Sequence, residues 1–331
     1  MGLGAAEVGK LRRELRRMGA GRGTRVRHET GPRLVPPPRA PRPLVIPMPE
    51  ANVRGPGRNR AFQLPQYFAI ANGLRTAFCD AGRGDPVVLI HGLAGDLTHW
   101  VYVAPRLAAG HRVLALDLAA CGESERPREP LSVKLYAEQV RSLLDVVGLE
   151  RAALVGHSLG GMVAAELALA APERVSKLVL INPAGFQKMP LLLRAAGHAF
   201  LREPVLSTLL PPLWKKVLDV VFCEKNEHTR GFVESVESTY RVDDIHALSA
   251  VIASLKQDFL ERNFLAALDR LTVPTLLMWG AKDLLTPAKE LRETASRLPN
   301  VTTHEIPRCG HMPLIERPEL TVDLIRSHLA A

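Results

Sequence analysis

The segment Gly156–Gly160 has the sequence Gly-His-Ser-Leu-Gly, which matches the pattern G-x-S-x-G. The apolar run 152–155 precedes it, and an alanine-rich stretch follows it. A serine on a sharp turn between a strand and a helix is held in a strained conformation with its Oγ exposed, and the flanking glycines keep Cβ atoms out of the crowded turn. The pattern therefore predicts Ser158 as a nucleophile.

A serine hydroxyl is a weak nucleophile near neutral pH, so it needs a base, and the base needs an orienting group. His311 fits the base because it follows Cys309-Gly310, in a loop after the last strand-like run. Asp283 fits the orienting acid because it lies in a turn after the run that ends at Trp279-Gly280. The order Ser, Asp, His is known for such triads. These three residues predict hydrolysis of a carboxylic ester or related acyl bond through an acyl-enzyme.

Other histidines and aspartates fit these roles less well. His157 should point away from the neighbouring serine, and His304 falls inside a predicted strand. His91 and His198 stay open as alternative bases. The weaker acids are Asp243 and Asp244, which lie in the segment predicted as an insertion, and Asp269, which precedes the strand-like run that begins at Thr275.

The tetrahedral intermediate of acyl transfer carries an oxyanion that requires hydrogen-bond donors. One predicted donor is the backbone N–H of Leu159, directly after the nucleophile. The second is the backbone N–H of Leu93, in the glycine-containing loop 91–95. His91 and Asp96 also form an H-x4-D string of the kind found in acyltransferases, but its place in this loop gives it little weight.

The elements that must position these residues alternate between strand-like and helical patterns. Helices are predicted over Leu131–Val147, with Ser132 as N-cap, and over Leu159–Ala171. Asn72-Gly73 predicts a hairpin turn. The apolar strand-like runs are Val87–Ile90, Val113–Leu116, Ala152–Val155, Leu178–Ile181, Thr275–Trp279 and Val301–Ile306. Short apolar strands that alternate with helices predict a parallel sheet covered on both faces.

The alternation stops over residues 183–270, which predicts a helical cap inserted into a core formed by 61–182 and 271–331. Prolines at 190, 204 and 211–212 are expected to break its helices. The cap is rich in leucine, which suggests that it contacts a mainly apolar, lipid-like acyl group, although leucines also serve to pack a lid on its core. The cap is therefore predicted to contribute to substrate binding.

Residues 1–60 differ sharply in charge from the rest of the 331-residue chain. They hold 14 basic and four acidic side chains, a net charge of +10, so the total of +9 leaves −1 for the remainder. Their arginine and proline content predicts a mostly disordered arm, with a short basic helix over 7–18. This arm could contact an anionic membrane or another partner, or direct organelle import. No specific nucleic-acid binding is predicted, and the expected location is the cytoplasm.

The four cysteines are scattered and form no CxxC pair, so the sequence gives little support to a zinc site. No metal or organic cofactor is expected, and free thiols are expected in place of disulfides.

These motifs together resemble those of the α/β-hydrolase superfamily, in its cap-bearing lipase, esterase and C–C-hydrolase-like branch. The resemblance covers residues 67–329 and implies a mostly parallel, eight-stranded sheet with helices on both faces and an inserted helical cap. It departs from the family at Ala119-Ala120-Cys121, where relatives usually have a glycine soon after Asp117. Cys121 is either a residue of the substrate pocket or a buried structural thiol. The motifs that carry the resemblance are His91-Gly92, Asp117 with Gly122-Glu123-Ser124, Gly156–Gly161, Trp279–Asp283 and Gly310-His311.

Ser158 argues against the family's dehalogenases and epoxide hydrolases, which use an aspartate at this position. The alternatives that stay open are C–C bond hydrolysis of a diketone, cofactor-free perhydrolysis and acyl transfer on the same triad. A non-catalytic receptor or scaffold is a further alternative from a different class.

Overall fold

The computed structural model describes residues 45–47, 62–187 and 190–331. The chain divides into two units, Met1–Pro41 and Arg42–Ala331, and the structure described below is that of the second. The short basic helix predicted over 7–18 lies outside the described residues. The predicted disordered arm, residues 1–60, also lies outside them, except for residues 45–47.

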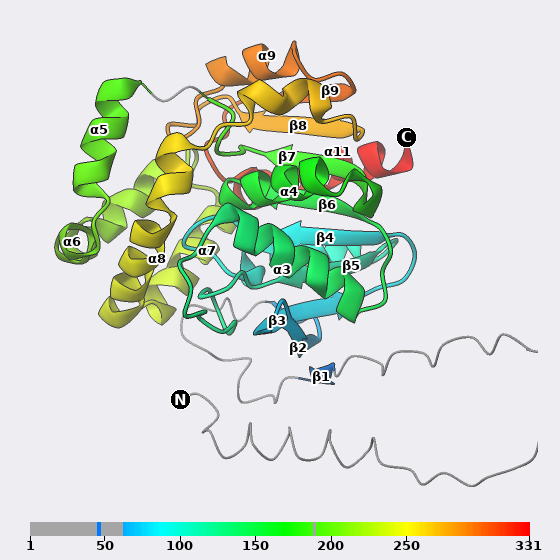
Figure 1. The fold of residues 1–331 in the computed structure, drawn as a ribbon, viewed down its shortest axis with the longest axis horizontal. Coiled ribbons are helices and arrows are strands. Elements are labelled where there is room, and N and C mark those ends of the chain that lie inside the picture. Colours follow the sequence, from blue (N-terminus) through cyan, green and yellow to red (C-terminus); the bar gives the residue numbers. More distant parts are fainter. Residues whose placement is uncertain (1–44, 48–61, 188–189) are drawn as a thin grey trace, which may run out of the picture. The chain divides into compact units, whose positions relative to one another are not determined.

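One sheet contains all the strands of the described residues, in the order β1-β2-β3-β5-β4-β6-β7-β8-β9 (Figure 1). The predicted eight-stranded, mostly parallel sheet corresponds to β2–β9: β2 and β3 are antiparallel to their neighbours, and β4–β9 run parallel. No strand was predicted before residue 61, but β1 (Ile46–Pro47) pairs with β2 at the edge. The other strands are β2 (Gln66–Ala71), β3 (Leu74–Ala81), β4 (Pro86–Ile90), β5 (Arg112–Leu116), β6 (Ala152–His157), β7 (Val175–Ile181), β8 (Thr275–Gly280) and β9 (Val301–Ile306).

The predicted hairpin turn joins β2 and β3. Asn72 and Gly73 both have positive φ, 50° and 74°. Two consecutive left-handed residues match the twist of an antiparallel pair, which is why the Asn-Gly pair favours this turn.

The register of the parallel strands aligns their carboxyl ends. Ile90 of β4 lies beside Gly156 of β6, and Ile181 of β7 lies beside both His157 of β6 and Met278 of β8. Loops that leave these ends therefore meet along one edge of the sheet, the edge where parallel α/β sheets place their sites.

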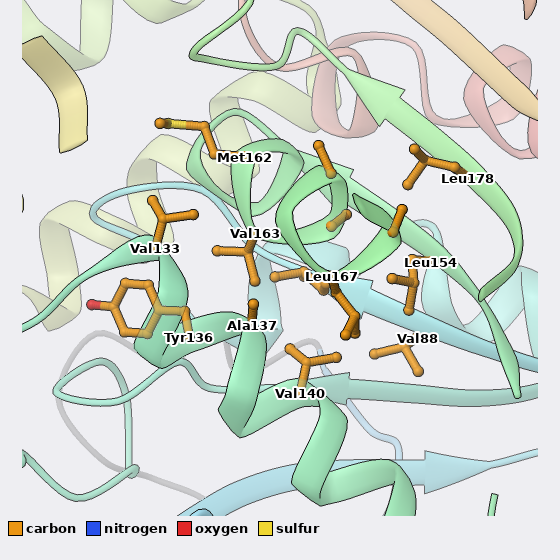
Figure 2. Close-up of a cluster of buried hydrophobic side chains, with 14 of the residues drawn as sticks. Val88, Val133, Tyr136, Ala137, Val140, Leu154, Met162, Val163, Leu167 and Leu178 are labelled. Atoms are coloured by element: carbon orange, nitrogen blue, oxygen red, sulfur yellow. The ribbon is translucent and has the colours of Figure 1, made fainter. Parts of the chain in front are cut away.

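Helices cover both faces of the sheet because its strands are buried on both sides. Val88 and Ile90 belong to one core cluster, whereas the alternating Val87 and Leu89 belong to the other. On the first face, Figure 2 shows side chains of α3 (Val133–Val146) packed against α4 (Leu159–Ala170) and the strands. The second cluster includes residues of η2 (Leu97–Trp100), α2 (Ala104–Leu107) and α11 (Pro318–Ala330). Short elements complete the core: η3 (Pro172–Arg174), α9 (Lys289–Ala295) and α10 (Pro313–Glu316).

Both predicted core helices are present. The Ser132 side chain accepts a hydrogen bond from the N–H of Leu135 at 3.1 Å, which satisfies one of the free donors at the start of α3. α4 begins at Leu159, directly after the predicted nucleophile.

Four helices and a short 3-10 segment lie between β7 and β8, where the sequence predicted an insertion. They are α5 (Leu191–Phe200), α6 (Glu203–Val221), α7 (Glu227–Thr239), α8 (Val242–Glu261) and η4 (Leu265–Arg270). Among the described residues, no helix has both the length and the apolar character that a membrane span requires.

The prolines of the cap behave in two ways. Pro190 precedes α5 and Pro204 lies in the first turn of α6, where a missing N–H costs nothing. The predicted break at Pro211-Pro212 is wrong, because α6 continues through both. The carbonyls that lose a donor belong to Ser207 and Thr208, which are not buried, so water can satisfy them. Burial of Trp214 and Leu218 in the next turns holds α6 in place within the cap, where it packs against α8.

Candidate active site

Ser158 lies at the sharp turn between β6 and α4. Its φ and ψ are 53° and −115°, a left-handed conformation that is unusual for a residue with a side chain. The N–H of Ser158 donates to the carbonyl of Ile181 on β7 at 3.0 Å. The turn is thus held by the neighbouring strand while the serine side chain stays partly exposed.

Glycines make this turn sterically possible. A Cβ atom on Gly156 would overlap the carbonyl of Gly160, and one on Gly160 would overlap the carbonyl of Ile90. A Cβ atom on Gly92 would lie 3.1 Å from the Cβ of Ser158. The loop after β4 therefore approaches the serine closely because residue 92 has no side chain.

Asp283 follows β8 and is 5% exposed. Its Oδ2 accepts hydrogen bonds from Asn182 Nδ2 and Thr286 Oγ1, each at 2.5 Å, and from His311 Nδ1 at 2.8 Å. Its Oδ1 accepts from the backbone N–H groups of Leu285 and Thr286. Burial alone would raise the pKa of this carboxyl, but the hydrogen bonds and the His311 ring outweigh burial and lower the pKa to about 2. Asp283 is therefore a carboxylate at neutral pH.

His311 lies in the loop after β9 and is 6% exposed. In the neutral ring, Nδ1–H donates to Asp283, so Nε2 carries the lone pair that a base requires. The backbone of the same residue is also fixed, because its N–H donates to Val221 of the cap and its carbonyl accepts from His157 Nε2, both at 2.8 Å.

Ser158 and His311 line one cavity of about 370 Å³. Within the described residues no hydrogen bond joins the Ser158 hydroxyl to the His311 ring. Such a contact is often long until substrate binds. Cap residues contribute much of the wall, as predicted for 183–270; they include Gln187, Arg194, Phe259, Leu260 and Asn263.

The predicted oxyanion donors lie on the two segments that meet at Ser158. Leu159 is the first residue of α4, so its N–H has no partner within the helix. Leu93 follows Gly92, which lies against the serine. Among the described residues, neither of these two N–H groups donates to another backbone carbonyl.

The alternative bases are engaged elsewhere. His91 Nδ1–H donates to the carbonyl of Gly92, and its Nε2 accepts from the N–H of Leu118. His198 contacts Glu261 within the cap at 2.9 Å. His157 binds the carbonyl of His311, and burial followed by the nearby His311 ring lowers its pKa well below the usual range. His157 therefore serves as a support.

The alternative acids are also accounted for. Asp243 and Asp244 lie in the first turn of α8, where Asp244 accepts from the N–H of Arg241. Asp269 is exposed on η4, and His304 lies in β9 as predicted. Asp96 caps η2 by accepting from the N–H of Thr98, so the H-x4-D string has a structural partner for its aspartate.

Of the two roles considered for Cys121, the structure favours the structural thiol. Cys121 does not line the cavity at Ser158 and packs against the core cluster beneath α3. Burial, reinforced by the carboxylates of Asp117 and Asp96, raises the pKa of its thiol to about 12. Ala120 lies in the segment Ala119-Ala120-Cys121 that departs from the family pattern. Its φ is 66°, a value that glycine adopts more easily than alanine.

Sequence reasoning missed two residues that hold the carboxylate of Asp283, namely Asn182 and Thr286. Asn182 follows β7 with a φ of 43°, and Thr286 comes three residues after Asp283. The only sequence signal was an asparagine at the end of an apolar strand, because asparagine tolerates this conformation better than most residues. Within the described residues, no group of three His, Cys, Asp or Glu side chains could hold a metal ion.

A family model described as the alpha/beta hydrolase fold matches residues 85–318. An uncharacterised protein of Mycobacterium tuberculosis is 29% identical over 78% of this chain and 79% of its own length. The 2-hydroxy-6-oxononadienedioate/2-hydroxy-6-oxononatrienedioate hydrolase of Comamonas testosteroni is 28% identical over 74% and 89%. The solved structure of a bacterial membrane phospholipase A superposes with a TM-score of 0.67 at 27% identity, covering 82% of this chain and 87% of that one. With its family model spanning most of the folded residues, the chain belongs to the α/β-hydrolase family.

Proposed function

We propose that this protein is a serine hydrolase that cleaves a carboxylic ester of a mainly apolar acid through an acyl-enzyme. His311 Nε2 takes the proton of Ser158, and Oγ attacks the substrate carbonyl carbon. The alcohol leaves with the proton from His311. Water then gives a proton to His311 and attacks the acyl carbon, and that proton returns to Ser158 as the acid departs. Asp283 stays ionised and orients the ring.

Backbone donors are proposed to stabilise the oxyanion of each tetrahedral intermediate. The N–H groups of Leu93 and Leu159 come from the two segments that adjoin Ser158. Leu159 also begins α4, where the partial positive charge of the helix end favours a developing negative charge.

The cavity supports a small or medium-sized substrate with an apolar portion. Phe259, Leu260 and Leu285 are among its lining residues, and a volume of about 370 Å³ falls in the range of small-molecule sites. The phospholipase A resemblance is consistent with an acyl ester.

The observation that carries this proposal is the combination at one cavity of a left-handed serine and a buried histidine whose Nδ1 is bound to a carboxylate. A solvent serine on an ordinary turn would not require the backbone strain, and a structural histidine would not need to line the same cavity as that serine.

A panel of p-nitrophenyl esters of increasing acyl length tests the proposal. We expect turnover that favours longer acyl groups, and a fall in kcat of roughly 10⁶-fold in Ser158→Ala. Thr98→Ser, a change in a buried residue outside the cavity, serves as the folding-matched control. Failure of the folded wild-type protein to hydrolyse any ester of the panel would reject ester hydrolysis.

C–C bond hydrolysis is a second candidate, favoured by the resemblance to the Comamonas hydrolase, whose substrate names denote dicarboxylates. Arg194 lines the cavity and supplies a cation that could pair with a substrate carboxylate. A ring-cleavage diketone assayed beside the esters separates the two: a higher kcat/KM for the diketone would favour C–C hydrolysis over ester hydrolysis.

A further inference from the structure

Helix α5 presents leucines to solvent, and its polar side chains contact helix α8. Its exposed side chains are all apolar, and four are large: Leu191, Leu192, Leu193 and Phe200 are 74%, 80%, 59% and 61% exposed. Its two polar side chains, Arg194 and His198, both contact the carboxylate of Glu261 at the end of α8, at 3.1 and 2.9 Å. A helix whose outer face meets only water has the opposite arrangement.

Helix α6 continues this surface. Leu209, Leu213, Val217 and Val220 are 37–46% exposed, and their spacing places them on one stripe of the helix. Trp214 and Leu218, on the neighbouring stripe, are buried. The apolar face of α6 is therefore wider than the part that the rest of the protein covers.

The surface reaches the mouth of the catalytic cavity. Arg194 of α5 and Leu285 of the loop after β8 both line the cavity that contains Ser158. Leu284 and Leu285 are 71% and 47% exposed, so this loop adds exposed apolar side chains. α5 packs against α8 and lies on the side of the cap away from the sheet (Figure 1).

Helices α5 and α6 carry a small excess of positive charge, although Arg194 pairs with Glu261 and Lys215 pairs with Glu237. Residues 191–221 contain four basic and two acidic side chains. One of the acidic pair, Asp219, is matched by Lys225 at 2.8 Å. Arg202 and Lys216 are exposed and form no ion pair within the described residues. These two cations beside the apolar face complement an anionic lipid surface. The chain as a whole is also basic, because residues 1–60 carry a net charge of +10.

We propose that the exposed apolar surface of α5 and α6 docks on an anionic lipid bilayer, with the cavity mouth directed toward the lipid. A second copy of this chain fits less well, because it would bring the exposed Arg202 and Lys216 of both copies together. Docking also gives an apolar ester a direct route to Ser158. That route rests on the proposed ester hydrolysis, whereas membrane binding itself does not.

Vesicle sedimentation with the full-length protein tests the docking. The vesicles are phosphatidylcholine alone or phosphatidylcholine mixed with phosphatidylglycerol. We expect binding to the mixed vesicles, and an affinity at least about tenfold lower in Leu192→Glu/Phe200→Glu, because two large side chains no longer enter the hydrocarbon. Ile70→Glu/Val242→Glu is the matched control, since both residues are exposed and apolar outside this surface. Ser158→Ala should bind like the wild type.

Three outcomes would overturn the docking proposal. The first is a wild-type protein that ignores mixed vesicles. The second is equal binding by wild type and Leu192→Glu/Phe200→Glu, which would assign the binding to basic residues elsewhere in the chain and not to this apolar surface. The third is self-association on size exclusion that this variant abolishes without any vesicle binding, which would make the surface a dimer interface. Hydrolysis of a soluble ester by every variant except Ser158→Ala verifies folding and reports the proposed function separately.

Discussion

At the residue scale, the site depends on how firmly Asp283 is held. Five hydrogen bonds from described residues reach its two oxygens. Three of them converge on Oδ2, and the bond from His311 is one of these three. Such a carboxylate can neither rotate nor protonate easily, so it fixes both the orientation of the imidazole and the ring nitrogen that carries its proton.

Replacement of this carboxylate should therefore affect catalysis more than binding. In Asp283→Asn the amide can donate to the ring and select the wrong tautomer of His311, so we expect kcat to fall by about 10⁴-fold with little change in KM. Steady-state kinetics on a nitrophenyl ester measures this. Asp269→Asn, an exposed aspartate of η4, is the control and should be unaffected. An Asp283→Asn enzyme with near-normal kcat would contradict the orienting role.

The same carboxylate should contribute to stability in a defined pH range. Folding lowers its pKa from 3.8 to about 2, so its contribution is fully present above pH 3.8 and is lost as the pH falls through 2. The shift corresponds to about 2 kcal/mol. We expect the difference in unfolding free energy between wild type and Asp283→Asn to shrink by about this amount between pH 5 and pH 2. Urea denaturation at each pH measures it, and a difference independent of pH would refute the assignment.

The sequence was informative about the residues proposed to react and silent about those that support them. Ser158, Asp283 and His311 each follow a recognisable strand, and chemistry restricts their types. Asn182 and Thr286 act by donating one hydrogen bond each to a side chain distant in sequence or in a loop. Many residue types could donate such a bond, so no local pattern identifies the supports.

At the element scale, α10 links the cap to the loop that contains His311. Glu316 is 1% exposed, and its carboxylate accepts from the N–H groups of Cys223 and Glu224 in the cap and of Gly310 beside the histidine, at 2.9, 3.1 and 2.8 Å. The carbonyl of Val221 also accepts from the N–H of His311. The end of α6 and the histidine loop are thus one hydrogen-bonded unit, and Glu316 is a positioning residue.

Glu316→Gln should therefore loosen the histidine without altering the cavity wall. The amide replaces one accepting oxygen with a donor, so we expect a loss of stability of about 1–3 kcal/mol and a fall in kcat of roughly 10- to 100-fold, while KM changes little. Thermal unfolding and steady-state kinetics measure the two effects. Glu319→Gln, at an exposed carboxylate on α11, is the control. A change in KM alone would assign Glu316 to substrate binding.

Local patterns predicted the core elements well and the cap less well. Ser132 caps α3 as expected because capping depends on a residue and its next three neighbours. The course of α6 through Pro211-Pro212 depends on tertiary packing of Trp214 and Leu218, which outweighs the local penalty of proline. The edge strand β1 likewise needs β2 as a partner before its two residues can be recognised.

At the scale of the whole molecule, the core carries the residues of the proposed chemistry, and the cap forms part of the cavity wall. Residues from 85 to 318 match the family model, and the cavity wall combines core residues with the cap residues 187, 194 and 259–263. The motifs fixed by chemistry could therefore predict the fold and the reacting residues. Which cap side chains face the cavity follows from helix packing that sequence periodicity does not determine.

All residues of the candidate site lie in the unit Arg42–Ala331. Deletion of Met1–Pro41 retains β1 and the whole of this unit, so hydrolysis of a soluble ester should stay within about twofold of the full chain. Assays of kcat/KM on the two forms measure this. A soluble, folded truncation that has lost ester hydrolysis would show that the basic segment takes part in catalysis.

Reaction with a fluorophosphonate tests the central claim most directly, because the reagent forms a stable adduct only with an activated serine. Intact mass and peptide mapping of the wild-type protein should find one adduct, on Ser158, and the rate of labelling should drop sharply in His311→Ala. Absence of labelling in folded wild type, or an adduct that persists in Ser158→Ala, would contradict the account.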